Sequence, residues 1–188
     1  MPVIEKPLKM ARKYISACVS NGDLAVDATA GNGHDTLFLA RLVGANGRVI
    51  SFDKQKKAIE NTYRRLKAEN MLPRVDLIQD GHEHMANYIH SPVAAVMFNL
   101  GYLPGGDHTL ITRPQTTLDA LGASLWKLRP GGVITIVCYT GHEGGKEEKA
   151  ALLTFLQGLE QKSFTVLHYA ILNQVNAPPS LLAIEKRA

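Results

Sequence analysis

The stretch Asp27-Ala28-Thr29-Ala30-Gly31-Asn32-Gly33-His34-Asp35 decides the fold of this chain. It follows the short apolar run 24–26 and precedes residues 36–40, whose apolar spacing is that of a starting helix, so it is predicted to be a strand-to-helix turn. Such turns bind nucleotides in Rossmann-like sheets, because glycine lets a ligand approach the backbone closely and the helix offers unpaired N–H groups. Gly31 and Gly33 are the residues expected at that approach. Taken alone, a glycine-rich turn is also compatible with a simple tight turn.

Length and composition are those of an ordinary globular chain. The 188 residues are 45% hydrophobic and 20% charged, which fits one domain over residues 1–188. The 21 basic and 17 acidic residues give a net charge of +4, which permits a polyanionic partner without requiring one. Cys18 and Cys138 have no CxxC spacing, and the sequence shows neither an apolar leader nor a membrane-length apolar run. We therefore expect a cytoplasmic protein with no membrane partner.

Apolar runs and helical patterns alternate along the chain. Strands are expected over residues 24–26, 48–53, 75–80, 93–98 and 133–139. Helices are expected over residues 8–19, 56–70, 114–128 and 146–161, after the opening turn, and from near residue 82. This α/β alternation predicts a parallel sheet with helices on both faces. Segments 164–172 and 180–186 are also strand-like, and the gap between them is too short for a crossover helix. They are therefore predicted to form an antiparallel hairpin that completes a mostly parallel, seven-stranded, Rossmann-like sheet. The basic face of helix 56–70 is expected to be solvated.

Two carboxylates are expected at the carboxyl edge of this sheet. Asp53 ends the second strand twenty residues after Gly33, where an acidic residue of a nucleotide-binding βαβ unit accepts hydrogen bonds from ribose hydroxyls. Asp80 ends the third strand, and it either joins Asp53 at the ligand or caps the helix that starts near His82. No spacing of possible ligands indicates a metal site.

The sheet layout and the loop resemble the class I S-adenosylmethionine-dependent methyltransferases. The loop of that superfamily reads acidic-x-Gly-x-Gly-x-Gly, and here Thr29 stands in place of the first glycine. The resemblance implies S-adenosylmethionine as cofactor, with Asp53 at its ribose diol and Asp80 with His82 at its adenine. The cofactor-binding residues that it implies are Asp27, Thr29, Gly31, Asn32, Gly33, Asp35, Thr36, Asp53, Asp80, His82 and Asn99.

The segment Asn99-Leu100-Gly101-Tyr102 follows the fourth expected strand. Amino-group methyltransferases of the superfamily carry an Asp/Asn-Pro-Pro-aromatic motif there, and this chain keeps the Asn and the aromatic residue but not the prolines. An Asn carbonyl can accept hydrogen bonds from an amine and orient its lone pair, and an aromatic face packs a base or stabilises a cation. Asn99 and Tyr102 are therefore candidate catalytic residues. The alternative is a structural loop in which Tyr102 fills the core.

Three further polar residues are expected in loops at the same edge. An alkylamine is protonated near neutral pH and only its neutral form attacks, so a group must take up the proton. Asp107 and His142 are the candidates for that catalytic role, and His108 is a candidate substrate contact. All three follow the fourth or fifth strand. The alternative is that they are surface loop residues with no role in the site.

Four motifs carry a closer resemblance, over nearly the whole chain. They are residues 27–36, 99–108, 139–145 and 173–179, the last reading Asn-Gln-Val-Asn-Ala-Pro-Pro. They resemble the MnmM (YtqB) family, small bacterial enzymes formerly labelled rRNA methylases, whose members methylate the amine of 5-aminomethyl-2-thiouridine at the wobble position of tRNA. The resemblance implies a tRNA anticodon stem-loop as substrate. The substrate-binding residues expected are Tyr102, His108, Tyr139, Asn176 and Pro178.

The sequence is also compatible with other functions. The same Asn-x-x-Tyr arrangement would serve a methyltransferase acting on rRNA or on a small amine, and a non-catalytic RNA-binding module could retain the cofactor as structure. Residues 176–179 are also compatible with a stiff turn. Because the chain has no appended RNA-binding module, we expect a homodimer that enlarges the RNA surface.

Overall fold

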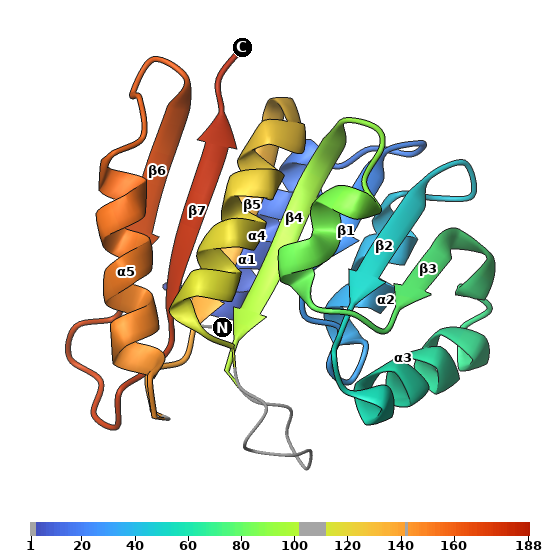
Figure 1. Cartoon of the computed structure of the whole chain (residues 1–188), viewed down its shortest axis with the longest axis horizontal. Coiled ribbons are helices and arrows are strands. Elements are labelled where there is room, and N and C mark those ends of the chain that lie inside the picture. The colour runs from blue at the N-terminus through green and yellow to red at the C-terminus, as the bar shows by residue number, and fades with distance from the viewer. Residues whose placement is uncertain (1–2, 102–111, 142) are drawn as a thin grey trace.

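The computed structural model describes residues 3–101, 112–141 and 143–188, and a seven-stranded sheet forms its centre (Figure 1). The strand order is β3-β2-β1-β4-β5-β7-β6. The strands are β1 (Leu24–Asp27), β2 (Arg48–Phe52), β3 (Val75–Ile78), β4 (Val93–Leu100), β5 (Leu128–Cys138), β6 (Phe164–Tyr169) and β7 (Ser180–Lys186). The first five are parallel, and β7 is antiparallel to both β5 and β6, which confirms the predicted terminal hairpin.

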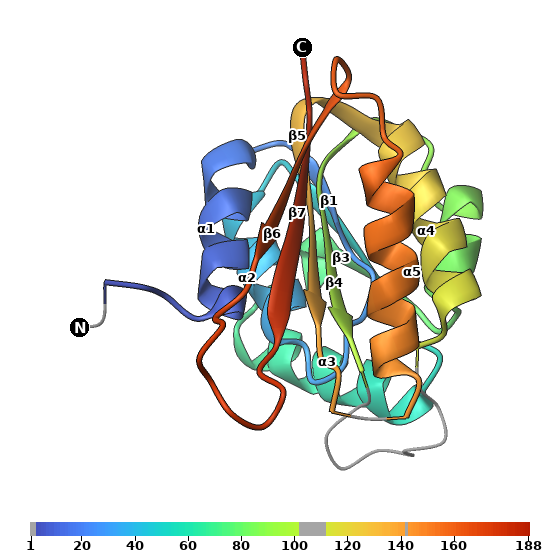
Figure 2. The ribbon, with the colours of Figure 1, turned by 90° about the vertical axis from the view of Figure 1, so that its left-hand side faces the viewer.

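Helices cover both faces of this sheet, as the alternation predicts (Figure 2). They are α1 (Pro7–Cys18), α2 (His34–Leu42), α3 (Lys56–Ala68), α4 (Pro114–Lys127) and α5 (Gly145–Gln157), with short 3₁₀ helices η1 (Leu72–Arg74) and η2 (His82–Asn87). One buried apolar cluster joins the sheet to α1, α2 and α3 through Ile15, Leu39 and Leu66. A second joins the other face to α4 and α5, through residues such as Leu121 and Leu152. Burial on both faces explains why the central strands are nearly continuous apolar runs.

Local structure differs from the sequence-based expectation at three places. The connection between β3 and β4 holds only the 3₁₀ helix η2 and no α-helix. Strand β4 continues to Leu100, so Asn99 lies within the strand and not in the loop after it. Strand β5 begins at Leu128, before the expected start at residue 133, and the register between β4 and β5 shifts over this added stretch. Gly131 adopts a φ of +71° there, a conformation that suits glycine in such an irregularity.

Gly33 is constrained by packing as well as by its backbone conformation. Gly33 precedes α2 with a φ of +77°, and a Cβ at this position would lie 2.9 Å from the Cα of Thr62 on α3. The opening turn therefore packs directly against α3, with no space between the two backbones for a side chain.

Gly33→Ala should destabilise the protein more than Gly131→Ala. Both variants strain a positive φ, at a cost of about 1 kcal/mol, but a Cβ at Gly131 meets nothing within 4 Å. The contact with Thr62 should cost a further 1–3 kcal/mol, roughly the cost of overpacking. Urea unfolding of the two variants measures the difference, and equal losses would show that α3 moves aside without cost.

Candidate active site

The carboxylate of Asp27 anchors the opening turn from within the protein. Asp27 is fully buried at the end of β1 and accepts hydrogen bonds from the Thr36 hydroxyl (2.6 Å) and the Thr29 backbone N–H (3.1 Å). The Thr36 oxygen also lies 2.9 Å from the Ser51 hydroxyl of β2, which donates to it because the Thr36 proton is already committed. Burial, followed by the nearby charge of Asp35, raises the pKa of Asp27 to about 7. Asp27 thus ties the turn to α2 and β2.

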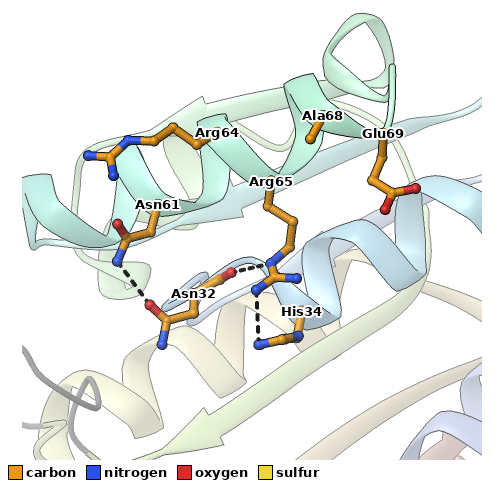
Figure 3. Close-up of a pocket in the computed structure, with 7 residues that line it drawn as sticks. All are labelled: Asn32, His34, Asn61, Arg64, Arg65, Ala68 and Glu69. Carbon is orange, nitrogen blue, oxygen red and sulfur yellow. Dashed lines mark hydrogen bonds between the residues drawn. The ribbon is translucent and has the colours of Figure 1, made fainter.

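Helix α3 holds the outer side of the same turn (Figure 3). The Thr62 hydroxyl donates to the Gly31 carbonyl (3.2 Å), and Asn61 Nδ2 donates to Asn32 Oδ1 (2.9 Å). Arg65 Nε donates to the Asn32 carbonyl at 2.6 Å. These contacts line a surface hollow of about 480 Å³, formed by Asn32, His34, Asn61, Arg64, Arg65, Ala68 and Glu69. The side chain and carbonyl of Asn32 are therefore both bound to α3.

Asp53 lies against the turn on its inner side. It directly follows β2, and its Oδ2 accepts a hydrogen bond from the Gly31 N–H at 2.9 Å, while its Oδ1 accepts one from the Gln55 N–H at 2.9 Å. Burial raises the pKa of Asp53, and the two N–H donors oppose that shift. The structure thus brings Asp53 to Gly31, the pair that the sequence predicts at the cofactor.

Asp80 has a more local set of contacts. It accepts hydrogen bonds from the Gly81 N–H (2.7 Å) and the Tyr88 hydroxyl (2.9 Å), and it lies 2.8 Å from Nδ1 of His84. The bond to His84 is the largest cause that lowers the pKa of Asp80. The residue before η2 is Gly81 and that helix has no side-chain cap, so the capping alternative for Asp80 is wrong.

His82 is buried, with 8% of its surface exposed. Its Nδ1 lies 3.1 Å from the Ala28 carbonyl, and its ring packs edge-on against Phe98. Burial lowers the pKa of His82, so the ring is neutral at neutral pH and Nδ1 carries the proton that bonds Ala28. Nε2 is then a buried acceptor without a hydrogen-bond partner among the described residues.

Asn99 joins the turn to a second buried carboxylate. Its backbone N–H donates to the Thr29 hydroxyl at 2.8 Å, and its side-chain Nδ2 donates to Asp35 Oδ2. Asp35 Oδ1 in turn accepts two hydrogen bonds from Arg12 of α1, from Nε at 2.9 Å and from Nη2 at 2.7 Å. The Asn99 Oδ1 is buried and has no partner in the part of the chain that the structure describes.

The structure describes some of the remaining predicted site residues and not others. Burial and the charge of Asp35 raise the pKa of Tyr139, which is 40% exposed beside β5. Asn176 has a φ of +66° and is exposed, with Pro178 partly buried, in the connection between β6 and β7. Tyr102, Asp107, His108 and His142 lie outside the described residues.

Four contributing residues are absent from the sequence predictions. Arg12 has no local signal, since its partner Asp35 is 23 residues away, and Asn61, Thr62 and Arg65 belong to the helix whose basic face is expected to be solvated. Within the described ranges no group of three or more His, Cys, Asp or Glu could hold a metal ion. Across the same ranges, no helix is both long and apolar enough to span a bilayer.

Fold and site together define an S-adenosylmethionine-dependent methyltransferase of class I: a parallel sheet with an antiparallel terminal hairpin, and a glycine turn beside strand-end carboxylates. Residues 49–185 match the sequence model of the family described as "Putative rRNA methylase", and the chain belongs to this family.

Named relatives agree with this assignment. A "tRNA (mnm(5)s(2)U34)-methyltransferase, chloroplastic" of Arabidopsis thaliana is 37% identical over 184 residues, covering 93% of this chain and 67% of the plant protein. The crystal structure of a "putative rRNA-methylase" from Clostridium thermocellum is 52% identical, with a TM-score of 0.96 over 98% of this chain and 100% of that one. A methyltransferase from Streptococcus mutans in complex with SAH is 41% identical, with a TM-score of 0.91 over 98% and 99% of the two chains.

Replacing Asp27 by Asn should remove a pH dependence of stability. The raised pKa of Asp27 means that folding favours its protonated form, so its contribution is present below the unfolded pKa and is lost as the pH rises through about 7. Between about pH 5 and about pH 8, the free energy of unfolding of the wild type should fall relative to Asp27→Asn by on the order of 2 kcal/mol. Urea unfolding at each pH tests this, and parallel curves for the two proteins would contradict it.

Proposed function

We propose that the protein transfers a methyl group from S-adenosylmethionine to the amine of 5-aminomethyl-2-thiouridine at the wobble position of tRNA, giving the 5-methylaminomethyl form. The observation that carries the proposal is the buried Asn99 Oδ1, which has no hydrogen-bond partner among the described residues and lies beside the glycine turn. A carbonyl oxygen in this position suits a substrate that donates a hydrogen bond from nitrogen. The printed name of the plant relative supports the choice of that nitrogen.

The described residues fit the cofactor. His82 Nε2 is an acceptor that suits the amino group of adenine, and Asp53, beside Gly31, suits the hydroxyls of ribose. The missing Cβ of Gly31 permits a ligand to approach the backbone of the turn closely, whereas the missing Cβ of Gly33 gives room for Thr62 of α3. Asp27 is fully buried and accepts hydrogen bonds on both oxygens from Thr29 and Thr36, so its proposed part in cofactor binding is to hold the turn in shape.

The substrate amine must be neutral to react. A primary alkylamine resembles lysine, with a pKa of about 10.4, so one proton must leave before attack. The cofactor supplies an electrophilic methyl group, so that an N–C bond forms as the S–C bond breaks and the nitrogen then releases one further proton. Asn99 accepts a hydrogen bond from the amine and directs its lone pair, Tyr102 packs against the base, and Asp107 or His142 takes up the proton.

The RNA is read by loops at the carboxyl edge. Single-stranded bases are recognised by stacking and by hydrogen bonds to their edges, and the anticodon loop presents such bases. Asn176 and Pro178 are exposed or partly exposed in the β6–β7 connection and contact the unstacked wobble base in this proposal, with His108 and Tyr139 beside it. A homodimer enlarges the surface that the anticodon stem-loop covers.

Cells that lack the gene should accumulate 5-aminomethyl-2-thiouridine in tRNA and lose the methylated nucleoside. Nucleoside mass spectrometry of separated tRNA and rRNA measures both changes, and the purified protein should restore the methyl group on tRNA from the deletion strain. An unchanged tRNA with a lost methyl group in rRNA would instead support the rRNA reading, which the family description favours. Binding of labelled cofactor without turnover on any RNA would indicate a non-catalytic module.

Asn99→Ala should lower kcat on that tRNA by on the order of 100-fold, the usual cost of removing one oriented polar group from an active site. Its KM for S-adenosylmethionine should change little. Asn87→Ala, at an exposed position at the end of η2, is the matched control and should keep the wild-type rate. Full activity of a folded Asn99→Ala protein would exclude the proposed role.

A further inference from the structure

The two oxygens of Asp35 are both used inside the protein. Oδ1 accepts two hydrogen bonds from Arg12, and Oδ2 accepts the side-chain N–H of Asn99. Asp35 itself is only 6% exposed. Asp53 is bonded to the Gly31 N–H of the glycine turn, whereas Asp35 is bonded to the side chains of Arg12 and Asn99. Asp35 bridges α1 and the end of β4.

The charge of Asp35 decides which way the Asn99 amide points. A carboxylate only accepts hydrogen bonds, so it selects the NH₂ end of the amide and turns the carbonyl oxygen to the opposite side. Thr29 holds the backbone of the same residue, which leaves the side-chain torsions as the remaining freedom. The Asn99 Oδ1 is therefore buried and accepts no hydrogen bond from any of the described residues.

Arg12 offsets the free-energy cost of burying the Asp35 carboxylate. A buried carboxylate needs a partner charge or several donors, and the fork of Arg12 supplies two N–H groups to one oxygen. The guanidinium also lies over the ring of Phe38, with 5.3 Å from its carbon to the ring centroid, which restricts its orientation.

We propose that Arg12 and Asp35 are positioning residues that keep the Asn99 carbonyl oxygen turned toward the methyl-accepting amine. Asp35 acts through Asn99 and does not bind the cofactor. The inference rests on the role of Asn99 given under the proposed function. An Asn at position 35 could donate to the Asn99 oxygen, so the amide would reverse and its acceptor would be consumed within the protein.

Steady-state kinetics of Asp35→Asn on the wobble-uridine tRNA provide the first test. We expect kcat to fall by about 10- to 100-fold, as for other residues that orient a reacting group, with the KM for S-adenosylmethionine within about threefold of wild type. Asp76→Asn is the matched control, because it makes the same change in an exposed ion pair with Arg48 on the far edge of the sheet. An increase in the KM for S-adenosylmethionine with unchanged kcat would overturn the proposal and assign Asp35 to the cofactor.

A double-mutant cycle separates positioning from general stability. If Asp35 acts through Asn99, Asp35→Asn should have no further effect on kcat in the Asn99→Ala background. If the two residues act independently, the factors by which the two substitutions lower kcat should multiply. Arg12→Lys keeps the charge and loses the fork, so it should lower kcat by a smaller factor and serves as the second variant if Asp35→Asn does not fold.

A measurement without turnover keeps this test distinct from that of the proposed function. In the NMR spectrum of the wild type, the Asn99 side-chain NH₂ should show slow hydrogen exchange, identified by its loss in Asn99→Asp, and Asp35→Asn should abolish that protection. Protection that survives in Asp35→Asn would overturn the inference whatever the substrate. Protected NH₂ protons in a wild-type protein that does not methylate the tRNA would refute the proposed function and leave the orientation established.

Discussion

The buried carboxylate of Asp27 is the constraint on which the site depends. Its two hydrogen bonds hold Thr29 on one side of the turn and Thr36 at the start of α2 on the other, and Thr36 extends the contact to Ser51 of β2. Burial raises the pKa of this group, so the bonds oppose a desolvation cost that an apolar residue would not incur. What the protein gains is a turn with one conformation, which a flexible glycine sequence does not provide by itself.

The position of β1 in the sheet carries that constraint to the substrate side. Strand β1 lies between β2 and β4, where the strand order reverses, and the turn continues the pairing on both sides through Ala30 N–H to Phe52 (2.8 Å) and Ala28 N–H to Met97 (2.9 Å). Thr29 therefore reaches the backbone of Asn99. The glycine turn and Asn99 are joined directly by this hydrogen bond, so a displacement of the turn would also displace Asn99.

Local patterns in the sequence were sufficient for the order of elements, the terminal hairpin, and the meeting of Asp53 with the glycine turn. They were insufficient for contacts that depend on how helices pack. Arg65 sits on a basic helix face that is typical of solvated surface, and only the packing of α3 on Gly33 brings it to the Asn32 carbonyl. Arg12 likewise meets Asp35 through the docking of α1. The shift of register that places residues 129–132 within β5 depends on a partner strand and leaves no periodic signal.

The choice of an amide at position 99 has a consequence for amine chemistry. A carboxylate beside an alkylamine would stabilise the ammonium form and raise its pKa, which keeps the lone pair protonated. In the proposed reaction, the amide oxygen of Asn99 would accept a hydrogen bond from the neutral amine without that penalty. The negative charge lies instead on Asp35, which accepts a hydrogen bond from the Asn99 amide and forms an ion pair with Arg12. Under the proposed function, the network would orient the substrate amine without placing a negative charge beside it.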